Sequence, residues 1–429
     1  MTHVSSILVV GAGQAAAVAV AALRDQGYQG QITVIGNEAH APYERPPLSK
    51  AVLASVQADE PVIAIKEADF FIARNVDLRL GLEATSLDAS KRQATLSDGS
   101  VLQYDRCLIA TGGNARVLAG LPASSAHIHY LRTLDDARAL RAKLAKCRHA
   151  VIIGGGFLGL EIASTARALG IKVSVIETAG RVLARAVPQA FSSWLQTRAT
   201  RSGATLYMGQ SITAINIPEN AEAFASILLA DGTELNADAI IVAVGLTPNT
   251  SLAQHANLHI DPANGGISVD NLCRTSDPHI YAAGDCTSQS RPGYPGTLRL
   301  ESWQNANEQA RVAASAMLDQ DTAAPAYPWF WTDQFDCNVQ MLGLPQPDLV
   351  YVTRGNADPD NPAPKFVMLG LRDGTPYHAL AVNAAGDLRA LRPLLERSLP
   401  IDSSRFADES ITLREFAKAT VAAAAPTVP

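Results

Sequence analysis

Two glycine-rich segments hold the residue types best suited to binding phosphates. The first reads Gly11-Ala12-Gly13-Gln14-Ala15-Ala16, and the second reads Gly154-Gly155-Gly156-Phe157-Leu158-Gly159. Each follows a short apolar run and precedes a stretch of helical character, so each predicts a strand, a tight turn and a helix. In such a turn the first glycine permits the bend, the second lets the backbone approach a pyrophosphate, and the third lets the helix pack on the strand. The helix N-terminus then offers N–H groups and a favourable dipole to the phosphates.

An acidic residue follows the second segment at the end of the next predicted strand. Glu177 lies 23 residues after Gly154. A carboxylate there accepts hydrogen bonds from ribose hydroxyls and repels a 2′-phosphate, which favours NADH over NADPH; a solvated loop acid is the alternative. In the first segment Gly36 and Asn37 occupy the corresponding place and Glu38 follows. Both Asn37 and Glu38 stay candidates for the first ribose contact.

A second pair of segments indicates that the chain is duplicated. Asp98-Gly99 begins a run that ends in Thr111-Gly112, and Asp231-Gly232 begins a run that ends in Gly245, aligned at an offset of 133 residues. Asp-Gly predicts a hairpin turn, and an apolar run that ends in glycine predicts a buried strand whose end approaches a ligand closely. Thr111, Gly112 and Gly245 are therefore candidate ligand contacts, and the sequence predicts two nucleotide-binding units.

Length and composition narrow the function classes. The chain has 429 residues, 47% of them hydrophobic and 18% charged, so it has room for about two to four domains and is too apolar to be disordered. The formal net charge of −6 argues against a nucleic-acid-binding protein. The apolar stretch 7–23 contains glycines, is too short to span a bilayer comfortably, and follows no Lys or Arg of a secretory signal. We therefore expect a soluble protein.

Cysteines, histidines and the C-terminal tail add three expectations. The five cysteines form no CxxC pair, and the nine histidines show no metal or triad spacing. An odd, unpatterned set of cysteines favours a reducing compartment, so we expect a cytoplasmic protein without a metal site. The tail from Ala419 contains only Ala, Thr, Val and Pro, and we expect it to be frayed.

Five further motifs occur in order along the chain. They are Pro42-Tyr43-Glu44-Arg45-Pro46-Pro47-Leu48-Ser49-Lys50, Ala110-Thr111-Gly112, Tyr281-Ala282-Ala283-Gly284-Asp285, Glu301-Ser302-Trp303-Gln304-Asn305-Ala306 and Pro328-Trp329-Phe330-Trp331-Thr332-Asp333-Gln334. Together they resemble the FAD-containing, NADH-dependent ferredoxin reductases that serve bacterial cytochrome P450s and Rieske-type oxygenases. The resemblance covers nearly the whole chain.

The resemblance implies an α/β fold with two Rossmann-like dinucleotide-binding domains, arranged as in glutathione reductase, and a C-terminal α+β domain. The expected FAD-binding domain comprises residues 1–114 and 246–325, the NAD-binding domain residues 115–245, and the C-terminal domain residues 326–429. The resemblance also implies which residues contact FAD: Gly11, Gly13, Ala15, Asn37 or Glu38, Arg45, Lys50, Ala84, Thr111, Gly112, Arg132, Asp285 and Trp303. The NADH contacts are then expected at Gly154, Gly156, Gly159, Glu177 and Gly245.

Four residues are expected to act in the reaction itself. The resemblance implies that Phe157 and Trp331 flank the stacked nicotinamide and flavin rings and that Glu161 pairs with Lys50. A lysine beside a flavin would stabilise the negative charge that develops as hydride arrives. Glu161 lies on an otherwise apolar helix face, where a buried carboxylate needs a partner. A surface lysine, a solvated acid and core packing of the two rings are the alternatives.

The function implied is that of an oxidoreductase. NADH gives a hydride to FAD, which passes electrons singly to a [2Fe–2S] ferredoxin, with no nucleic acid or membrane as partner. Disulfide reductases, NADH oxidases and peroxidases of this fold need reactive cysteines after the first glycine turn, whereas the first cysteine here is Cys107, on a predicted buried strand. An NADH-responsive flavoprotein of the apoptosis-inducing-factor type and a rubredoxin reductase are the alternatives.

Overall fold

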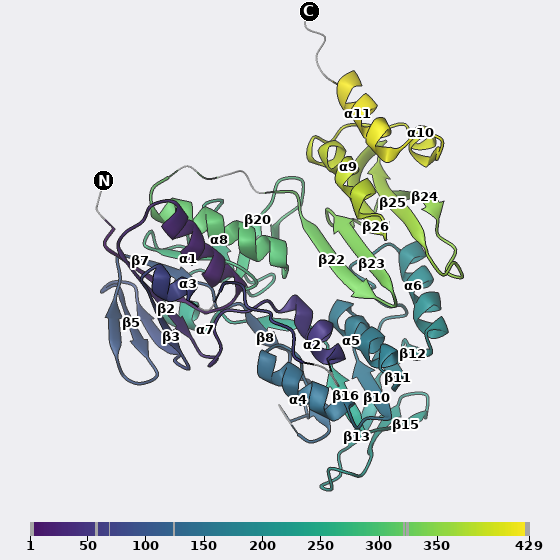
Figure 1. The fold of residues 1–429 in the computed structure, drawn as a ribbon, viewed down its shortest axis with the longest axis horizontal. Coiled ribbons are helices and arrows are strands. Elements are labelled where there is room, and N and C mark those ends of the chain that lie inside the picture. The colour runs from purple at the N-terminus through teal and green to yellow at the C-terminus, as the bar shows by residue number, and fades with distance from the viewer. Residues whose placement is uncertain are drawn as a thin grey trace, which may run out of the picture. The chain divides into compact units, whose positions relative to one another are not determined.

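The computed structural model describes residues 4–55, 59–67, 69–122, 125–320, 322 and 326–424. The chain divides into two units (Figure 1). Unit 1 consists of residues 1–46, 62–114 and 246–326, and unit 2 of residues 47–61, 115–245 and 327–429. A short 3-10 helix (Pro46–Ser49) and β8 (Gly113–Ala115) lie where the chain passes from one unit to the other.

Unit 1 is built on a parallel five-stranded sheet of order β19-β7-β1-β2-β3. Its described helices and strands are β1 (Ser6–Val10), α1 (Gln14–Asp25), β2 (Gln31–Gly36), α3 (Phe70–Ala73), β3 (Val76–Leu80), β4 (Ala84–Asp88), β5 (Gln93–Leu96), β6 (Val101–Gln103), β7 (Arg106–Ile109), β17 (Leu246–Pro248), α7 (Ser251–His255), β18 (Ile267–Val269), β19 (Ile280–Ala282), β20 (Thr287–Ser290), β21 (Thr297–Leu298) and α8 (Trp303–Met317).

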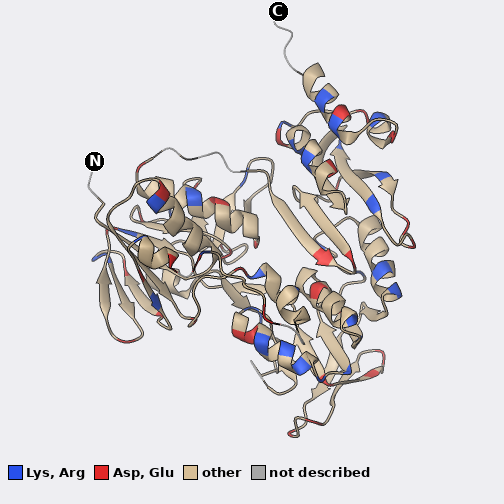
Figure 2. Ribbon diagram, in the orientation of Figure 1, with Lys and Arg blue, Asp and Glu red and all other residues tan. Residues whose placement is uncertain are grey.

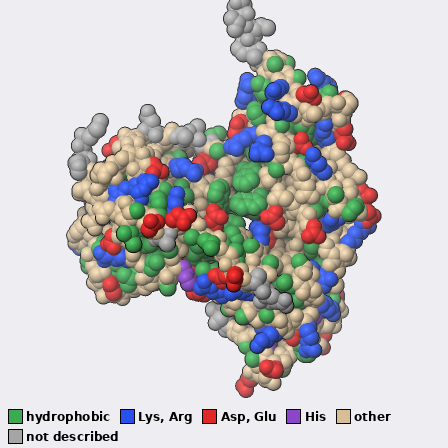
Figure 3. All heavy atoms as spheres, viewed as in Figure 1, with side chains coloured by type: hydrophobic (Ala, Val, Ile, Leu, Met, Phe, Trp, Pro, Cys, Tyr) green, Lys and Arg blue, Asp and Glu red, His purple; other side chains and the backbone are tan. Residues whose placement is uncertain are grey.

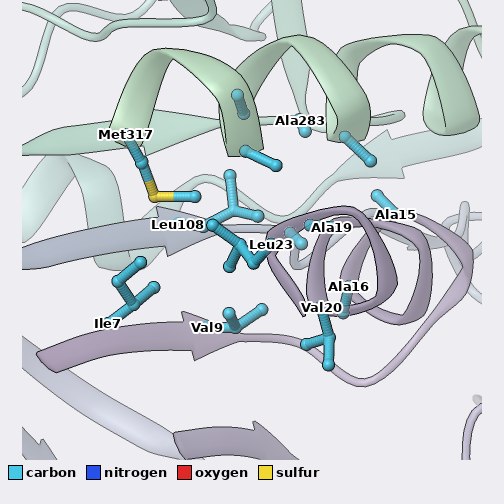
Figure 4. Packing of buried hydrophobic residues seen from close by; sticks show 14 of the residues in the cluster. Ile7, Val9, Ala15, Ala16, Ala19, Val20, Leu23, Leu108, Ala283 and Met317 are labelled. Carbon is cyan, nitrogen blue, oxygen red and sulfur yellow. The ribbon is translucent and has the colours of Figure 1, made fainter. Parts of the chain in front are cut away.

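The core of unit 1 explains the alanine-rich sequence after the first glycine turn. Alanine favours the helix, and its short side chain lets α1 lie close to its neighbours. Ala15, Ala16 and Ala19 of α1 are buried with Leu108 of β7 and Met317 of α8 (Figure 4). The stretch that resembled a membrane segment is thus a buried strand followed by a buried helix, as the sequence predicted. In the described part of the chain, no helix combines the length and hydrophobicity that crossing a bilayer requires.

Unit 2 holds a second parallel sheet, of order β12-β11-β10-β16-β9, and an antiparallel sheet, of order β22-β23-β26-β25-β24. Its described helices and strands are α2 (Ala51–Ala54), β9 (Ile128–His129), α4 (Leu134–Leu144), β10 (His149–Ile153), α5 (Phe157–Ala168), β11 (Lys172–Glu177), α6 (Gln189–Arg201), β12 (Ala204–Met208), β13 (Ile212–Asn216), β14 (Ala225–Leu229), β15 (Glu234–Ala237), β16 (Ala239–Val242), β22 (Trp329–Gln334), β23 (Cys337–Leu342), β24 (Val350–Asn356), β25 (Lys365–Arg372), β26 (Thr375–Val382), α9 (Ala385–Glu396), α10 (Ser403–Ala407) and α11 (Leu413–Ala423).

Four strands of the two parallel sheets have the same order and the same sequence of connections, as the predicted duplication requires. The order β3-β2-β1-β7 matches β12-β11-β10-β16, and each sheet is accompanied by a three-stranded antiparallel meander, β4-β5-β6 or β13-β14-β15. The fifth strand differs, because β19 is the last strand of its sheet along the chain and β9 is the first of its own. Gly99 and Gly232 have φ of +84° and +87° in equivalent hairpin turns. Two Rossmann-like sheets and an antiparallel sheet with helices confirm the predicted fold class.

The aligned aspartates of the duplication have one structural role. Asp105 accepts hydrogen bonds from the backbone N–H groups of Ser5 and Ser6, at 2.8 and 3.0 Å. Asp238 accepts the same pair of bonds from Arg148 and His149, both at 2.9 Å. Each carboxylate therefore binds the backbone N–H groups at the start of the central strand of its sheet.

The antiparallel sheet of unit 2 places β22 at an edge. Leu388, Leu391 and Leu395 of α9 pack on the sheet together with Phe406 and Phe416. Lys, Arg, Asp and Glu lie mostly on helices and loops, whereas β22 and β23 carry few of them (Figure 2). The motif that contains Trp331 is thus an edge strand.

Candidate active site

The first glycine loop joins β1 to α1 in unit 1. Gly11 has φ +111°, its N–H donates to Ile35 O at 2.8 Å, and a Cβ there would collide with the Ala110 carbonyl oxygen. Gly13 is the N-cap of α1: no side chain caps the helix, its first turn contains no acid, and a Cβ on Gly13 would meet nothing within 4 Å. The first-turn N–H groups are therefore left to an anion, which suits the pyrophosphate of a dinucleotide.

The polar residues after β2 have different environments. Asn37 is exposed, whereas the carboxylate of Glu38 is engaged by two neighbours. Arg45 donates to Glu38 Oε1 at 2.6 Å, and the hydroxyl of Tyr43 donates to Oε2 at 2.5 Å. The Arg45 guanidinium also lies over the Tyr43 ring, 5.2 Å from its centroid. Of the two candidates for a ribose contact, Glu38 is thus already bound within the protein.

The second glycine loop repeats this geometry between β10 and α5 in unit 2. Gly154 has φ +112°, its N–H donates to Ile176 O at 2.8 Å, and a Cβ there would collide with the Ala243 carbonyl oxygen. Gly156 is the N-cap of α5 without a capping side chain, and a Cβ on Gly159 would collide with the Gly154 carbonyl oxygen. Gly154 and Gly159 are thus required by the packing of this turn, whereas a Cβ on Gly156 would meet nothing within 4 Å. Like the first turn, this one leaves helix N–H groups for phosphates.

Glu177 ends β11 directly beside the second glycine loop. Its Oε2 accepts the Gly155 N–H at 2.8 Å, and its Oε1 accepts the Ala179 N–H at 2.8 Å. In unit 1 the large and the small residue are exchanged, since Ala12 stands in the turn and Gly36 ends β2. A Cβ on Gly36 would meet the Ala12 side chain at 2.5 Å. A larger residue inside the first turn therefore leaves no room for an acid at the end of β2.

The ion pair expected between Lys50 and Glu161 is present in unit 2. Lys50 Nζ lies 2.9 Å from Glu161 Oε1, with side-chain exposures of 22% and 9%. Two hydroxyls also donate to the carboxylate, Ser49 to Oε2 at 2.5 Å and Thr332 to Oε1 at 2.6 Å. Asp333 Oδ2 lies 3.9 Å from the same ammonium. The buried acid has three donors from two distant segments of sequence, as a charge out of water requires.

One face of α5 assembles this cluster. Positions 157, 161, 164 and 165 follow helical spacing and so lie on one side of the helix. Phe157 contacts Phe330 with ring centroids 4.6 Å apart, and Ser164 accepts the Phe335 N–H at 2.7 Å. Thr165 donates to Ser49 O at 2.8 Å. The helix thus holds both the residues around Lys50 and the strand β22.

Trp331 lies on the other face of β22. Its ring stacks on Trp329, with centroids 5.1 Å apart and planes 20° apart, and Lys50 Nζ lies 6.0 Å from its centroid. Trp329, Phe330 and Trp331 are all half-buried, and hydrophobic side chains gather in the region of β22 in Figure 3. Phe157 therefore packs on the face of β22 that carries Phe330, whereas Trp331 lies on the opposite face, near Lys50.

The remaining predicted residues are distributed over both units. Thr111 donates to Asn249 O at 2.7 Å, and Gly112 and Gly245 have φ of +61° and +110° at the ends of equivalent strands. The other placements are Ala15 and Ala84, buried in α1 and β4 of unit 1; Asp285 and Trp303, half-buried in unit 1 after β19 and at the start of α8; and Arg132, half-buried in unit 2 before α4. Arg45 belongs to unit 1 and Lys50 to unit 2.

Comparison with known proteins identifies the family. The pyridine nucleotide-disulphide oxidoreductase family model matches residues 5–310, and a reductase C-terminal model matches residues 329–417. The ferredoxin–NAD(+) reductase component of the anthranilate 1,2-dioxygenase system of Burkholderia cepacia is 37% identical over 95% of this chain and 98% of its own. The chain belongs to the NAD-dependent ferredoxin reductases of oxygenase systems.

Two further comparisons place it in the same family. Putidaredoxin reductase of Pseudomonas putida is 33% identical over 97% of this chain and 98% of its own. The crystal structure of the covalent putidaredoxin reductase–putidaredoxin complex matches with a TM-score of 0.90 and 32% identity, covering 97% of this chain and 99% of that one. The family resemblance predicted from the motifs is therefore confirmed, and the chain is an oxidoreductase.

Members of this fold that use thiols need a reactive cysteine, and the cysteines here are unsuited to that chemistry. All five are free and buried. Burial raises the pKa of Cys147 and of Cys286 to about 11, so both thiols are protonated at neutral pH. Within the described residues no cluster of His, Cys, Asp and Glu could hold a metal ion.

Three buried polar residues near Glu161 were not singled out from the sequence as site residues: Ser49, Thr332 and Gln334, whose Nε2 lies 2.9 Å from Thr332 Oγ1. Ser49, Thr332 and Gln334 are 3%, 1% and 1% exposed and belong to motifs that carried the resemblance. Polar residues at alternate positions of a strand that is otherwise aromatic, as in Trp329–Gln334, are the signal that could have found two of them.

Proposed function

We propose that the protein is an NADH:ferredoxin oxidoreductase that oxidises NADH and reduces a [2Fe–2S] ferredoxin, which in turn feeds a cytochrome P450 or a Rieske-type oxygenase. The observation that carries the proposal is the assembly, on the single helix α5, of an uncapped N-terminus, Phe157 and the Lys50–Glu161 ion pair. The relatives named above are reductase components of oxygenase systems, which supports the choice of partner.

Two cofactors fit the residues present. The uncapped N-terminus of α1, Gly11 and Gly13 would hold the pyrophosphate of FAD, with Asn37 as the remaining candidate for its ribose and Asp285 following Gly284, which lies against Ala15. When bound, FAD accepts a hydride and releases electrons one at a time. The assignment of these contacts and the division into FAD-binding, NAD-binding and C-terminal domains belong to the proposal.

NADH would bind on the second glycine loop. The N–H groups at the start of α5 would receive its pyrophosphate, and Glu177, fixed by two backbone N–H groups, would receive the ribose hydroxyls and exclude a 2′-phosphate. Phe157 is the first residue of α5 and directly follows Gly156, where the phosphates would bind. Its ring would therefore border the nicotinamide end of NADH. Lys50 would supply the positive charge that stabilises electron density arriving on the acceptor, and Glu161 would hold that charge in place.

The location of the protein belongs to the same proposal. The five buried free thiols suit a reducing compartment, and we place the enzyme in the cytoplasm. Separation of soluble, membrane and periplasmic fractions of a host that produces the enzyme naturally would test this, and recovery of its activity outside the cytoplasmic fraction would contradict it.

The experiment that tests the function is NADH-dependent reduction of cytochrome c by the FAD-loaded enzyme, with and without a [2Fe–2S] ferredoxin. We expect a rate that rises with ferredoxin concentration and saturates. Rubredoxin in place of ferredoxin serves as the matched control. A rate that depends on rubredoxin alone, or that no electron carrier increases, would contradict the proposal.

A further inference from the structure

A buried polar network joins α8 to the segment that follows β19 in unit 1. Asn305 and Gln309 of α8 are 4% and 3% exposed and lie four positions apart, on one face of the helix. Thr287, Gln289 and Arg291 of the segment after β19 are buried as well. Burying so many polar groups costs free energy unless each is hydrogen-bonded, so their partners show what the network holds in place.

Gln309 is the centre of this network. Its Oε1 lies 2.9 Å from Gly284 N and 3.1 Å from Asn305 Nδ2, and its Nε2 lies 3.4 Å from Gln289 Oε1. A backbone N–H can only donate, so the atom that faces Gly284 is the amide oxygen. Thr287 Oγ1 lies 2.9 Å from that oxygen and also 2.9 Å from Gly284 O. Both amide atoms of Gln309 therefore have partners, and the Gly284 N–H is held by a side chain.

Asn305 is anchored in turn. Its Nδ2 also lies 3.1 Å from Leu300 O, a carbonyl that can only accept, and its Oδ1 receives Arg291 Nη2 at 2.6 Å. Arg291 forms an ion pair with Glu308 at 3.0 Å, with side-chain exposures of 4% and 15%. The network is therefore fixed on the side of α8, and the backbone that it positions is that of Gly284.

Gly284 begins the turn that carries Asp285. The Thr287 N–H donates to Gly284 O at 3.0 Å and closes the turn, in which Gly284 has φ +87°. Because β19, β7 and β1 are adjacent parallel strands, the residues after their carboxyl ends, Gly11 and Asp285 among them, lie at the sheet edge where such folds bind ligands. A Cβ on Gly284 would lie 3.4 Å from the Ala15 side chain, in the first turn of α1. The turn is thus a neighbour of the helix N-terminus that suits a pyrophosphate.

We propose that Gln309 is a positioning residue for FAD: by holding the Gly284 N–H, it fixes the turn that presents the Asp285 side chain to the cofactor. The inference rests on the proposed function, which assigns FAD to unit 1 and Asp285 to its contacts. Without an acceptor at position 309, the buried Gly284 N–H loses its partner, and the turn must rearrange to find another.

The test measures the dissociation constant of FAD, by diluting the FAD-loaded full-length enzyme and following the fluorescence of the FAD that is released. Gln309→Met keeps the length of the side chain and removes the acceptor, so it should raise Kd about tenfold or more. Gln309→Glu keeps an acceptor oxygen for Gly284 and should stay within about threefold of the parent Kd. The matched control is Gln26→Met, because Gln26 ties the other end of α1 to α8 by donating to Ser315 Oγ at 2.9 Å. It should lower the thermal midpoint and leave Kd unchanged, as a merely structural role requires.

A double-mutant cycle shows whether Gln309 acts through Asp285. In an Asp285→Ala enzyme, adding Gln309→Met should raise Kd by less than about threefold, because the contact that Gln309 positions is already gone. An equal fold-change in both backgrounds would overturn the proposal. So would an unchanged Kd in Gln309→Met, a Gln309→Glu enzyme that binds FAD as weakly as Gln309→Met, or an equal loss of affinity in Gln26→Met.

If Gln309→Met does not fold, Gln309→Asn decides. Its amide is one methylene shorter and withdraws from Gly284 while the position stays polar, so Kd should rise in the same direction by a smaller amount; an unchanged Kd overturns the proposal. A parent enzyme that holds no FAD refutes the proposed function together with this inference. A parent that holds FAD tightly, with Gln309 variants that hold it equally well, refutes this inference alone.

Discussion

Removing Lys50 tests how the buried carboxylate of Glu161 is stabilised. Breaking a fully buried ion pair costs about 3–5 kcal/mol, and an exposed pair contributes about 0–1 kcal/mol. Lys50 is 22% exposed, and after Lys50→Ala the hydroxyls of Ser49 and Thr332 still donate to Glu161. We therefore expect Lys50→Ala to lower the free energy of unfolding by about 1–2 kcal/mol, between those limits.

A double-mutant cycle isolates the interaction. Glu161→Gln removes the other charge, so Lys50→Ala and Glu161→Gln together should cost about 1–2 kcal/mol less than the sum of the two single changes. The measurement is the thermal midpoint of each FAD-loaded variant, where 1 kcal/mol corresponds to about 2–4 °C for a unit of this size. Flavin reduction by NADH, measured by stopped-flow, should be slow in Lys50→Ala and stay slow in the double variant, because the positive charge is still missing.

An exposed lysine supplies the control. Lys91 forms an ion pair with Asp88 at the same distance of 2.9 Å, but its side chain is 68% exposed. Lys91→Ala should leave the thermal midpoint and the rate unchanged. Additive losses of stability in the cycle would refute the interaction between Lys50 and Glu161, and a fast double variant would refute the electrostatic role of Lys50.

Three further predictions concern the second glycine loop and the C-terminal sheet. Glu177→Ala should reduce the preference for NADH over NADPH about tenfold in kcat/KM, and equal values for both cofactors in the parent enzyme would show that this acid is not at the ribose. Gly154→Ala should keep FAD and raise KM for NADH about tenfold or more, whereas Gly170→Ala, with a similar φ of +81° but open space around it, should leave KM nearly unchanged; similar KM values in both variants would refute the steric argument. Burial lowers the pKa of His378 to about 3, so between about pH 6.5 and pH 3 only the unfolded chain takes up this proton. The free energy of unfolding therefore decreases as the pH is lowered, by up to about 1.4 kcal/mol per pH unit. In acid unfolding monitored by circular dichroism, the free energy of unfolding should depend less steeply on pH in His378→Gln than in the parent protein. The control His255→Gln, at an exposed site, should keep the parent dependence. Equal pH dependence in His378→Gln and the parent would contradict a neutral buried His378.

The features predicted correctly from the sequence are those that depend on local chemistry. A turn that only glycine can make can be recognised from the sequence. Gly11 and Gly154 are examples, because any side chain there would collide with a neighbouring carbonyl oxygen. The Asp-Gly hairpins were predictable from backbone conformation instead, because Gly99 and Gly232 have φ of +84° and +87°, which other residues rarely adopt. The Lys50–Glu161 pair joins residues far apart in sequence, and it was predictable because a buried acid needs a partner and the family motif supplied one.

Other features depend on tertiary packing. Which hydroxyls bind Glu161 is set by how α5 packs on β22, 171 residues away along the chain, and no local pattern encodes the direction of a hydroxyl hydrogen. Likewise, the sequence after β2 left both Asn37 and Glu38 as candidates for the ribose contact, and the structure shows that Arg45 and Tyr43 bind Glu38.

The expectation of a frayed tail from Ala419 was wrong as far as Ala423. The helix α11 continues to that residue because Thr412 and Glu415 form a capping box at its start and Phe416 is buried. The composition of the segment from Ala419 cannot reveal this stabilisation, because the residues that stabilise the helix precede that segment. Residues 425–429 of the predicted tail lie outside the described residues.

The proposed reaction converts the electron pair of NADH into single electrons for a [2Fe–2S] ferredoxin. The most direct test mixes a catalytic amount of the FAD-loaded enzyme with excess oxidised ferredoxin and limiting NADH under anaerobic conditions, and counts reduced ferredoxin by its visible absorbance. We expect two ferredoxin molecules to be reduced for each NADH consumed, with no reduction when the enzyme is omitted. Complete oxidation of NADH by another route without ferredoxin reduction, or no oxidation at all in the presence of ferredoxin, would contradict it.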